Sequence, residues 1–347
     1  MRILFEITHP AHVHLFRYPI NILQSTGANI KVTSREKGVT TSLLDSYGIN
    51  HRTLSSASST YSLTSEWITR VSRLLSTVYS FNPDVIVGRF NPAAAVASTM
   101  AGCPYIMFED TEKSHKMIFS LTYRMSNIIH TPEGFNQNLG PKQTSYPGFH
   151  ELAYLHPNRF DPDSSILEQH DIKPGDRFSL IRFVGWEAHH DKNESGFSQK
   201  DRLRLVSLLS EYGEVYITSE GELPDDLAKY QLPIPPEHIH HLLYYSDIFV
   251  GDSQTMACEA GILGTPAIRY NSLAGGTSQH GGIQDELERE YGLIYSTDNI
   301  GESFAKIKEI IGNSRKEEIW QIRRKNLIND KIDVTHYITN SIRNVVV

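Results

Sequence analysis

The chain has 347 residues, of which 39% are hydrophobic and 21% charged, and its formal net charge is −7 at pH 7. This length predicts two domains of ordinary size, and the composition is typical of a soluble globular protein. Residues 1–155 contain 13 Lys and Arg against 10 Asp and Glu. That excess is too small to indicate nucleic-acid binding, but it is compatible with an anionic acceptor or a lipid surface.

No apolar run reaches the roughly 20 residues that a membrane-spanning helix needs. The first residues, MRILFEITHP, lack the apolar core and cleavage site of a signal peptide. Cys103 and Cys258 lie in apolar surroundings, so we interpret them as reduced core thiols. These features predict a cytoplasmic protein, which could also work at the inner face of the membrane.

Short apolar runs rich in β-branched residues alternate along the chain with amphipathic segments of helical period. The predicted strands are 3–7, 29–33, 50–54, 84–88, 104–108, 128–131, 178–183, 215–218, 247–251, 267–270 and 293–295. The predicted helices are 15–26, 39–47, 63–80, 92–101, 199–212, 238–245, 256–263 and 300–311, with one or two more in 316–347. This alternation predicts an α/β protein with parallel sheets of the Rossmann type.

The pattern restarts after a segment rich in proline and short polar residues, 157–162. We therefore predict an N-terminal domain, 1–157, and a C-terminal domain, 158–330. The remaining residues, 331–347, would form a C-terminal helix that could pack back on the first domain. Two Rossmann-like domains facing each other across a cleft are the expected architecture.

The stretch 242–268, LLYYSDIFVGDSQTMACEAGILGTPAI, is typical of a strand, a tight loop, a helix and a second strand. A helix that begins at the carboxyl end of a parallel strand presents unpaired N–H groups, which favour binding of a diphosphate. Glu259 lies farther along this helix, where its carboxylate could accept hydrogen bonds from ribose hydroxyls. An ordinary βαβ unit with a well-capped helix is the alternative interpretation.

This stretch resembles the donor-nucleotide segment of GT-B glycosyltransferases, both in MurG-type N-acetylglucosaminyltransferases and in non-hydrolysing UDP-N-acetylglucosamine 2-epimerases. Four other segments resemble more closely an uncharacterised GT-B-like family, a domain of unknown function in archaea and bacteria. They are MRILFEITHPAHVHLFR, SYPGFHELAYLHP, IRFVGWEAHHD and ITSEGELP. The resemblance extends to about Leu293 and implies a GT-B architecture, with an acceptor domain followed by a nucleotide-sugar domain.

The loop after the first strand departs from both better-known families. It reads THPAH, from Thr8 to His12, where the 2-epimerases have GTRPE, and this difference argues against epimerisation. MurG-type proteins have a glycine-rich loop that ends in histidine. Here His12 keeps the place of that histidine, whereas the glycines are replaced.

Three residues are the candidates for catalysis: His12, Glu109 and Asp110. His12 could deprotonate an acceptor hydroxyl or contact a phosphate, or it could only cap a helix. Glu109 and Asp110 follow a strand and could supply the acceptor base, or they could be N-caps of the next helix. Arg89, at a similar strand end, could bind an anionic acceptor group. His9 and His14 complete an H-x-x-H-x-H pattern with His12, but we expect metal-independent transfer and no cofactor.

The candidates for binding the nucleotide sugar follow strands of the second domain or lie in its glycine-rich loop. They are Gly185, Trp186, His189, Ser219, Glu220, Ile239, Asp252, Ser253, Gln254, Thr255, Glu259, Gln279 and His280.

One helix, 66–78, carries an apolar stripe with Arg70 and Arg73 interleaved; the stripe is Trp67, Ile68, Val71, Leu74, Leu75 and Val78. We expect most of this stripe in the core, and the alternative is a peripheral membrane face that binds a lipid-linked acceptor.

The sequence predicts a glycosyltransferase that moves a sugar from a UDP-activated donor to a glycan or lipid-linked acceptor in cell-surface polysaccharide or glycoconjugate synthesis. One alternative is an enzyme that resembles the UDP-N-acetylglucosamine 2-epimerases, or a UDP-sugar hydrolase. The other is a nucleotide-sugar-binding protein without catalytic activity.

Overall fold

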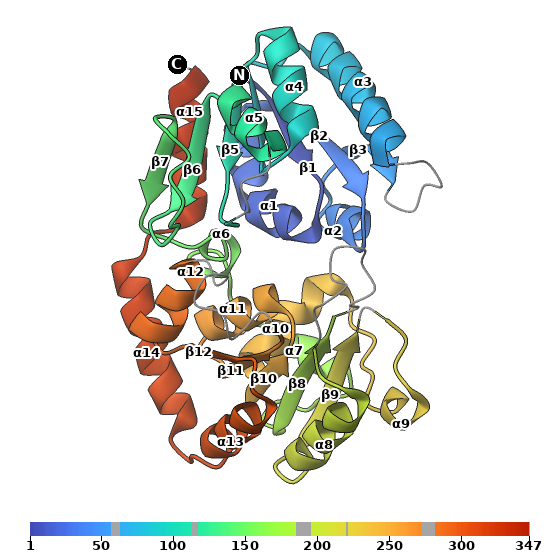
Figure 1. Ribbon diagram of the computed structural model, residues 1–347, viewed down its shortest axis with the longest axis vertical. Coiled ribbons are helices and arrows are strands. Elements are labelled where there is room, and N and C mark those ends of the chain that lie inside the picture. Colours follow the sequence, from blue (N-terminus) through green and yellow to red (C-terminus); the bar gives the residue numbers. More distant parts are fainter. Residues whose placement is uncertain (57–62, 113–116, 185–195, 220, 273–281, 347) are drawn as a thin grey trace. The chain divides into compact units, whose positions relative to one another are not determined.

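The computed structural model describes residues 1–56, 63–112, 117–184, 196–219, 221–272 and 282–346. They form two compact units, the first of residues 1–159 and 331–347 and the second of residues 160–330. Each unit contains one parallel sheet with helices packed against it (Figure 1). Within the described ranges, every helix is too short or too polar to span a lipid bilayer.

The sheet of the first unit has seven parallel strands in the order β3-β2-β1-β4-β5-β6-β7. The order reverses between β1 and β4, which pair with Ile3 opposite Val85. In sheets of this type, ligands bind beyond the carboxyl ends of the strands at such a reversal. The strands are β1 Arg2–Ile7, β2 Asn29–Glu36, β3 His51–Ser56, β4 Val85–Gly88, β5 Tyr105–Phe108, β6 Ile128–Pro132 and β7 Gln143–Tyr146.

Two helices of the first unit, α1 and α4, begin with a polar cap residue followed by a proline. His9 caps α1, which has Pro10 as its first residue, and Asn91 caps α4, which has Pro92 there. The C-terminal helix α15 packs on α1 and α6. The helices are α1 Pro10–Ser25, α2 Thr40–Ser46, α3 Leu63–Phe81, α4 Pro92–Ala101, α5 Met117–Met125, α6 Leu152–Leu155 and α15 Val334–Val346.

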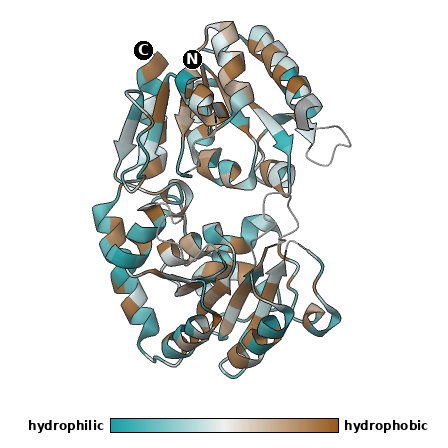
Figure 2. Ribbon diagram, viewed as in Figure 1, coloured by the Kyte–Doolittle hydropathy of each residue, from teal (hydrophilic) through white to brown (hydrophobic). Residues whose placement is uncertain are grey.

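The sheet of the second unit has five parallel strands in the order β12-β11-β10-β8-β9. Its order reverses between β8 and β10, so the loops after these two strands lie where a ligand would bind. Hydrophobic residues, brown in Figure 2, run along the strands, and those on both faces of the sheet are buried. The strands are β8 Phe178–Phe183, β9 Glu214–Ser219, β10 Ile248–Gly251, β11 Ala267–Tyr270 and β12 Ile294–Thr297.

Small residues allow α11 to lie close to this sheet. A Cβ atom on Gly261 would lie 2.7 Å from Cγ2 of Ile294, so only glycine fits there. The helices of the second unit are α7 Ser165–Glu168, α8 Gln199–Leu209, α9 Asp225–Ala228, α10 Ile239–Tyr245, α11 Gln254–Leu263, α12 Gly282–Asp285, α13 Ile300–Ile311 and α14 Lys316–Asp330. A 3-10 turn, Pro236–His238, precedes α10, and a π-helical turn, Glu286–Glu290, follows α12.

The structure corrects several boundaries and adds elements. The first helix begins at Pro10 and not at Leu15, because the polar segment read as a loop includes a cap and a helix-starting proline. α11 begins at Gln254, two residues earlier than predicted. β7 was not predicted, since its sequence, QTSY, has none of the apolar character of the other strands.

Candidate functional site

The N-terminus of α11 follows the carboxyl end of β10, at the strand reversal of the second sheet. Ser253 caps the helix, with its Oγ accepting a hydrogen bond from the backbone N–H of Met256 at 3.4 Å. Gln254 and Thr255, in the first turn, are exposed. The first turn of a helix has backbone N–H groups without intrahelical partners, and these are the groups a diphosphate would need.

Asp252 was predicted to contact the donor, but its side chain is almost completely buried. Its Oδ1 accepts a hydrogen bond from the backbone N–H of Val184 at 2.7 Å, in the loop after β8. Its carbonyl oxygen accepts one from Nδ2 of Asn271, after β11, at 3.0 Å. Asp252 therefore ties together the loops that follow three neighbouring strands and holds the start of α11 in place.

Glu259 points from α11 toward α10. Its Oε1 lies 3.1 Å from Nε2 of His240, and both side chains are buried. The buried carboxylate thus has a protein partner, and its contact with ribose stays a prediction. Ile239 is the first residue of α10, and Ser219 is the last residue of β9, where it pairs with Phe183 of β8. Ile239 and Ser219 are half-buried.

Six of the predicted donor-binding residues lie outside the described residues: Gly185, Trp186, His189, Glu220, Gln279 and His280. Their predicted contacts stay predictions.

In the first unit, charged side chains gather at the carboxyl ends of β4 and β5. The guanidinium of Arg89 forms an ion pair with Asp110, and its Nη2 donates to Oγ1 of Thr111 at 3.2 Å. On the other side of the same carboxylate, Oδ2 of Asp110 lies 2.8 Å from Nδ1 of His150. Oδ1 of Asp110 is therefore held by Arg89 and by Oγ1 of Thr111, which donates to it at 2.9 Å, and the imidazole of His150 lies beside Oδ2.

Glu109 and Asp110 play different parts although they are adjacent in sequence. The side chain of Glu109 is 0% exposed, and its Oε1 accepts hydrogen bonds from the backbone N–H groups of Asp110 and Thr111 at 3.2 and 3.0 Å. The side chain of Asp110 is 18% exposed. Glu109 shapes the loop, and Asp110 is the carboxylate that a substrate could reach.

The sequence reasoning missed His150, although it quoted the segment that contains it. Burial, with Arg89 as the second cause, lowers the pKa of His150 well below its ordinary value, so the imidazole is neutral at pH 7. Its ring stacks on Tyr146, the last residue of β7. Because β7 was not predicted, nothing in the sequence placed His150 at the edge of the sheet.

The three histidines near the N-terminus do different things. His12 lies in the first turn of α1, is buried, and has its Nδ1 3.3 Å from the backbone nitrogen of Thr8. The capping role weighed for His12 belongs to His9, whose Nδ1 accepts from the backbone N–H of Ala11 at 3.3 Å. His14 is buried, with its ring 5.2 Å from that of Tyr154. Within the described ranges, no three His, Cys, Asp or Glu side chains are grouped to hold a metal ion.

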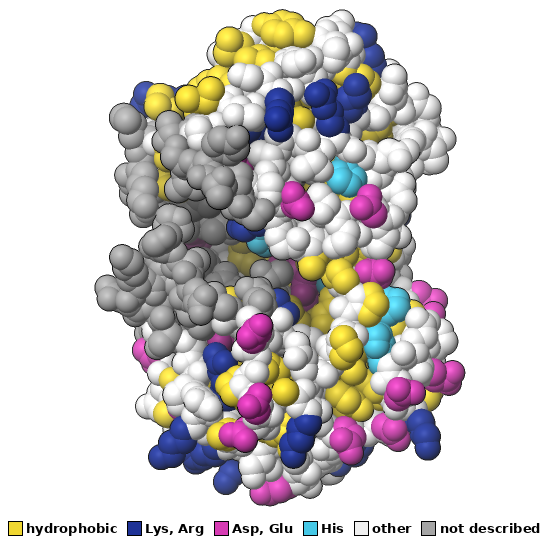
Figure 3. All heavy atoms as spheres, turned by 90° about the vertical axis from the view of Figure 1, so that its right-hand side faces the viewer, with side chains coloured by type: hydrophobic (Ala, Val, Ile, Leu, Met, Phe, Trp, Pro, Cys, Tyr) yellow, Lys and Arg dark blue, Asp and Glu magenta, His cyan; other side chains and the backbone are white. Residues whose placement is uncertain are grey.

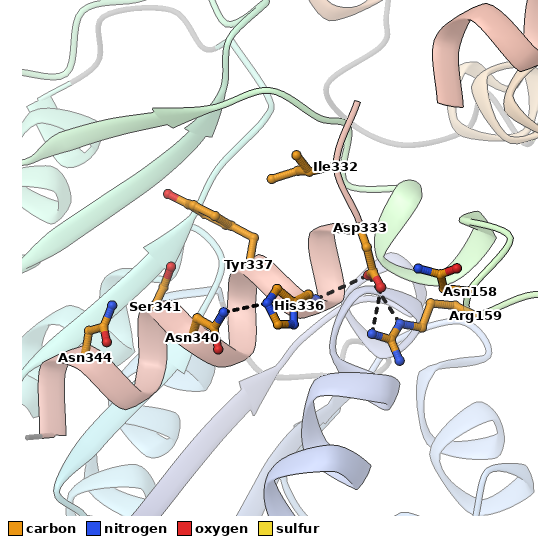
Figure 4. A pocket seen from close by; sticks show the side chains of 9 residues that line it. All are labelled: Asn158, Arg159, Ile332, Asp333, His336, Tyr337, Asn340, Ser341 and Asn344. Carbon is orange, nitrogen blue, oxygen red and sulfur yellow. Dashed lines mark hydrogen bonds and ion pairs between the residues drawn. The ribbon is translucent and has the colours of Figure 1, made fainter. Parts of the chain in front are cut away.

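A polar hollow of about 590 Å³ lies in the first unit, between α15 and the loop after α6 (Figure 4). Arg159 and Asp333 form an ion pair at 2.7 Å on its wall, and Nδ2 of Asn340 lies 2.9 Å from Nε2 of His336. The chain leaves the first unit after Arg159 and returns at Lys331. The ion pair therefore joins the two crossing segments, and none of the predicted site residues lines this hollow.

Comparisons with known proteins agree with this fold. A family profile described as "Protein of unknown function (DUF354)" matches residues 1–336. A search of curated protein sequences found no match.

Several solved structures resemble the fold of the chain at low sequence identity, including two named as UDP-GlcNAc 2-epimerases and one named as a glycosyltransferase. The UDP-GlcNAc 2-epimerase of Neisseria meningitidis, bound to UDP-GlcNAc, has a TM-score of 0.69 at 14% identity over 99% of this chain and 100% of its own. The UDP-GlcNAc 2-epimerase of Methanocaldococcus jannaschii has a TM-score of 0.63 at 13% identity over 93% and 99%. The Streptomyces sp. SF2575 glycosyltransferase SsfS6 has a TM-score of 0.59 at 13% identity over 99% of both chains. These similarities confirm a GT-B fold of two Rossmann-like units.

Proposed function

The chain belongs to the DUF354 family, and we propose that it is a glycosyltransferase that uses a nucleotide-activated sugar, with UDP as the nucleotide. The acceptor would be a glycan or a lipid-linked glycan in cell-surface polysaccharide or glycoconjugate synthesis. The observation that carries the proposal is Asp110, a partly exposed carboxylate at a strand end that pairs with Arg89 and lies beside the imidazole of His150.

A carboxylate in this position suits the acceptor half of the reaction. In transfer, the bond between the anomeric carbon and the diphosphate oxygen breaks, and a bond to the acceptor oxygen forms. The acceptor hydroxyl loses its proton, and a fixed base within hydrogen-bonding reach lowers the barrier to that step. Asp110 would receive this proton, while Arg89 and Thr111 keep the carboxylate oriented.

The N-terminus of α11 suits the donor half. The leaving diphosphate gains negative charge as the sugar departs, and the backbone N–H groups of the first turn could stabilise that charge without a metal ion. The Neisseria meningitidis protein of the same fold was solved with UDP-GlcNAc bound. This supports a nucleotide sugar as the ligand proposed for this chain.

A UDP-N-acetylglucosamine 2-epimerase, or a hydrolase of a UDP-sugar, is the second candidate. It is favoured by structural relatives that are named as UDP-GlcNAc 2-epimerases, among them those of Neisseria meningitidis and Methanocaldococcus jannaschii. The two candidates differ in what they require, because an epimerase or a hydrolase converts a UDP-sugar without any acceptor, whereas a transferase needs one.

The first test is a thermal-shift panel of UDP, UDP-sugars, other nucleotides and NAD. A ligand at 100 times its Kd stabilises a protein by about 2.7 kcal/mol, so UDP compounds should raise the melting temperature clearly while NAD should not. A panel without any response to nucleotides would contradict the proposal.

The second test follows the UDP-sugars that bind, by chromatography, with and without acceptor fractions from cell envelopes. UDP release and a glycosylated product only when acceptor is present would support the transferase. Conversion of UDP-GlcNAc alone would favour the second candidate. Binding without turnover in either assay would indicate a nucleotide-sugar-binding protein without catalytic activity.

A further inference from the structure

Exposed hydrophobic side chains gather on three helices of the first unit, α3, α4 and α5. Ten large hydrophobic side chains stand out as exposed in the described ranges, and six of them lie on these helices, with exposed fractions between 39% and 64%. The six are Trp67, Ile68, Tyr79, Met100, Ile118 and Leu121. We call them, with the exposed residues between them, the α3–α5 surface.

The three helices are neighbours, so these side chains share one face of the unit. α4 packs against both α3 and α5. The hydroxyl of Tyr79 on α3 donates to the carbonyl oxygen of Met100 on α4 at 3.4 Å. The inward face of the same helices, including Leu74, Val78 and Ala97, is buried in the core. The core therefore does not account for the outward hydrophobic residues.

In the described part of the three helices, the remaining exposed side chains carry no negative charge. They are hydroxyl residues and two arginines: Thr69, Ser72, Ser76, Ser80, Thr99, Ser120, Arg73 and Arg124. Glu66 is the one acidic residue in the sequence of these helices, and both its oxygens accept hydrogen bonds from Arg35 at 2.8 Å. The chain has 40 Asp and Glu, yet the described part of these three helices presents no exposed carboxylate.

The net charge of the whole first unit is also positive. The first unit contains 16 Lys and Arg against 11 Asp and Glu, a net charge of +5, whereas the second contains 17 against 29, a net charge of −12. Figure 3 shows hydrophobic (yellow) and Lys or Arg (dark blue) side chains together at the upper end of the first unit. An anionic surface would attract this unit and repel the other.

We propose that the α3–α5 surface docks this protein on a lipid bilayer that contains anionic headgroups. Trp and Tyr favour the boundary between headgroups and acyl chains, and exposed Ile, Leu and Met gain free energy when they enter that boundary. Arg124 would pair with lipid phosphates, as would the part of the Arg73 guanidinium that does not donate to the carbonyl oxygen of Leu54. In the described part of these helices, no exposed carboxylate opposes the contact. The inference does not depend on the proposed enzyme activity, and its test uses no nucleotide or acceptor.

The experiment is cosedimentation of the full-length protein with vesicles of phosphatidylcholine alone and with 30% phosphatidylglycerol. We expect binding to the anionic vesicles and little to the neutral ones. Trp67→Ser/Ile68→Ser should lower the partition coefficient at least tenfold, because both exposed apolar side chains are lost. Arg73→Gln/Arg124→Gln should lower it about fivefold for each arginine and reduce the preference for anionic lipid.

The matched control is Leu203→Ser/Ile322→Ser, which removes two exposed hydrophobic side chains of the second unit and should bind as the unaltered protein does. Circular dichroism would show that every variant is folded. Equal binding by Trp67→Ser/Ile68→Ser and by the control would overturn the inference, as would equal binding to neutral and anionic vesicles. So would a concentration-dependent dimer in light scattering that Trp67→Ser/Ile68→Ser dissociates, because the surface would then join two protein chains.

Discussion

The carboxyl edges of the two sheets are built from different groups, although both sheets are parallel and of the Rossmann type. At the edge of the first sheet, charged side chains from separate strand ends meet around Asp110. Among the described residues at the edge of the second sheet, the backbone N–H groups at the start of α11 have no intrahelical partner, and the acids Asp252 and Glu259 are buried with protein partners. The proposed function accordingly assigns proton transfer to the first edge and the diphosphate to the second.

Asp110→Asn tests the role of the first edge and has the largest expected effect. If Asp110 is the base, kcat/KM for transfer should fall about 100- to 10,000-fold, because an amide cannot take up the acceptor proton. Binding of UDP compounds should change little, since the proposed nucleotide contacts are in the other unit. Steady-state kinetics and calorimetry would separate these two effects.

Asp333→Asn is the control for that variant. Asp333 also pairs with an arginine of the first unit, Arg159, and has similar exposure, but it lies on the polar hollow. We expect it to keep kcat/KM within a few-fold of the unaltered protein. If both variants lost the same activity, the role assigned to Asp110 would be wrong.

At the second edge, Glu259→Ala should cost about 3 kcal/mol in the free energy of unfolding, because it leaves the buried imidazole of His240 without its carboxylate. Urea unfolding followed by circular dichroism measures this loss. Glu309→Ala, which removes an exposed ion pair with Lys306, should cost less than about 1 kcal/mol. A loss for Glu259→Ala no larger than that of the control would show that its partnership with His240 contributes little.

The first unit should also lose stability in mild acid. Burial lowers the pKa of His130 from 6.5 to about 4, so below pH 6.5 the unfolded chain binds a proton that the folded chain does not. The free energy of unfolding therefore falls as pH decreases from 6.5 toward 4, by about 2 kcal/mol at pH 5 for this group. Unfolding of His130→Asn at pH 7.5 and 5 should show that much less pH dependence, and an unchanged dependence would contradict the assignment.

The smallest expected effect concerns the helix caps of the second unit. Ser253→Ala and Ser198→Ala each remove the cap of one helix, α11 or α8, and each should cost about 1 kcal/mol in stability. Only Ser253→Ala should also weaken UDP binding, because only that cap orders the proposed phosphate site. Calorimetric titration of both variants with UDP compares them, and equal affinities would count against the role given to α11.

Much of the fold could be predicted because it depends on local sequence. The apolar runs at 84–88 and 247–251 are buried strands, and the GT-B resemblance is confirmed by the family and by the structural relatives. β7 could not be predicted in this way, because an edge strand needs little apolar sequence when its backbone pairs with a neighbour. His150 follows β7 in the chain, so without that strand it could not be placed at the edge of the sheet.

By itself, the sequence determined the alternation of strands and helices, the two-part organisation and the positions of the polar strand ends, because hydrophobic period and capping residues act over short distances. Only the tertiary structure decided which polar groups meet: Asp110 with His150, Glu259 with His240, and Asp252 with the loop after β8. Those partners are set by strand order and helix packing, which bring together residues far apart in the chain. No local pattern in the sequence specifies them.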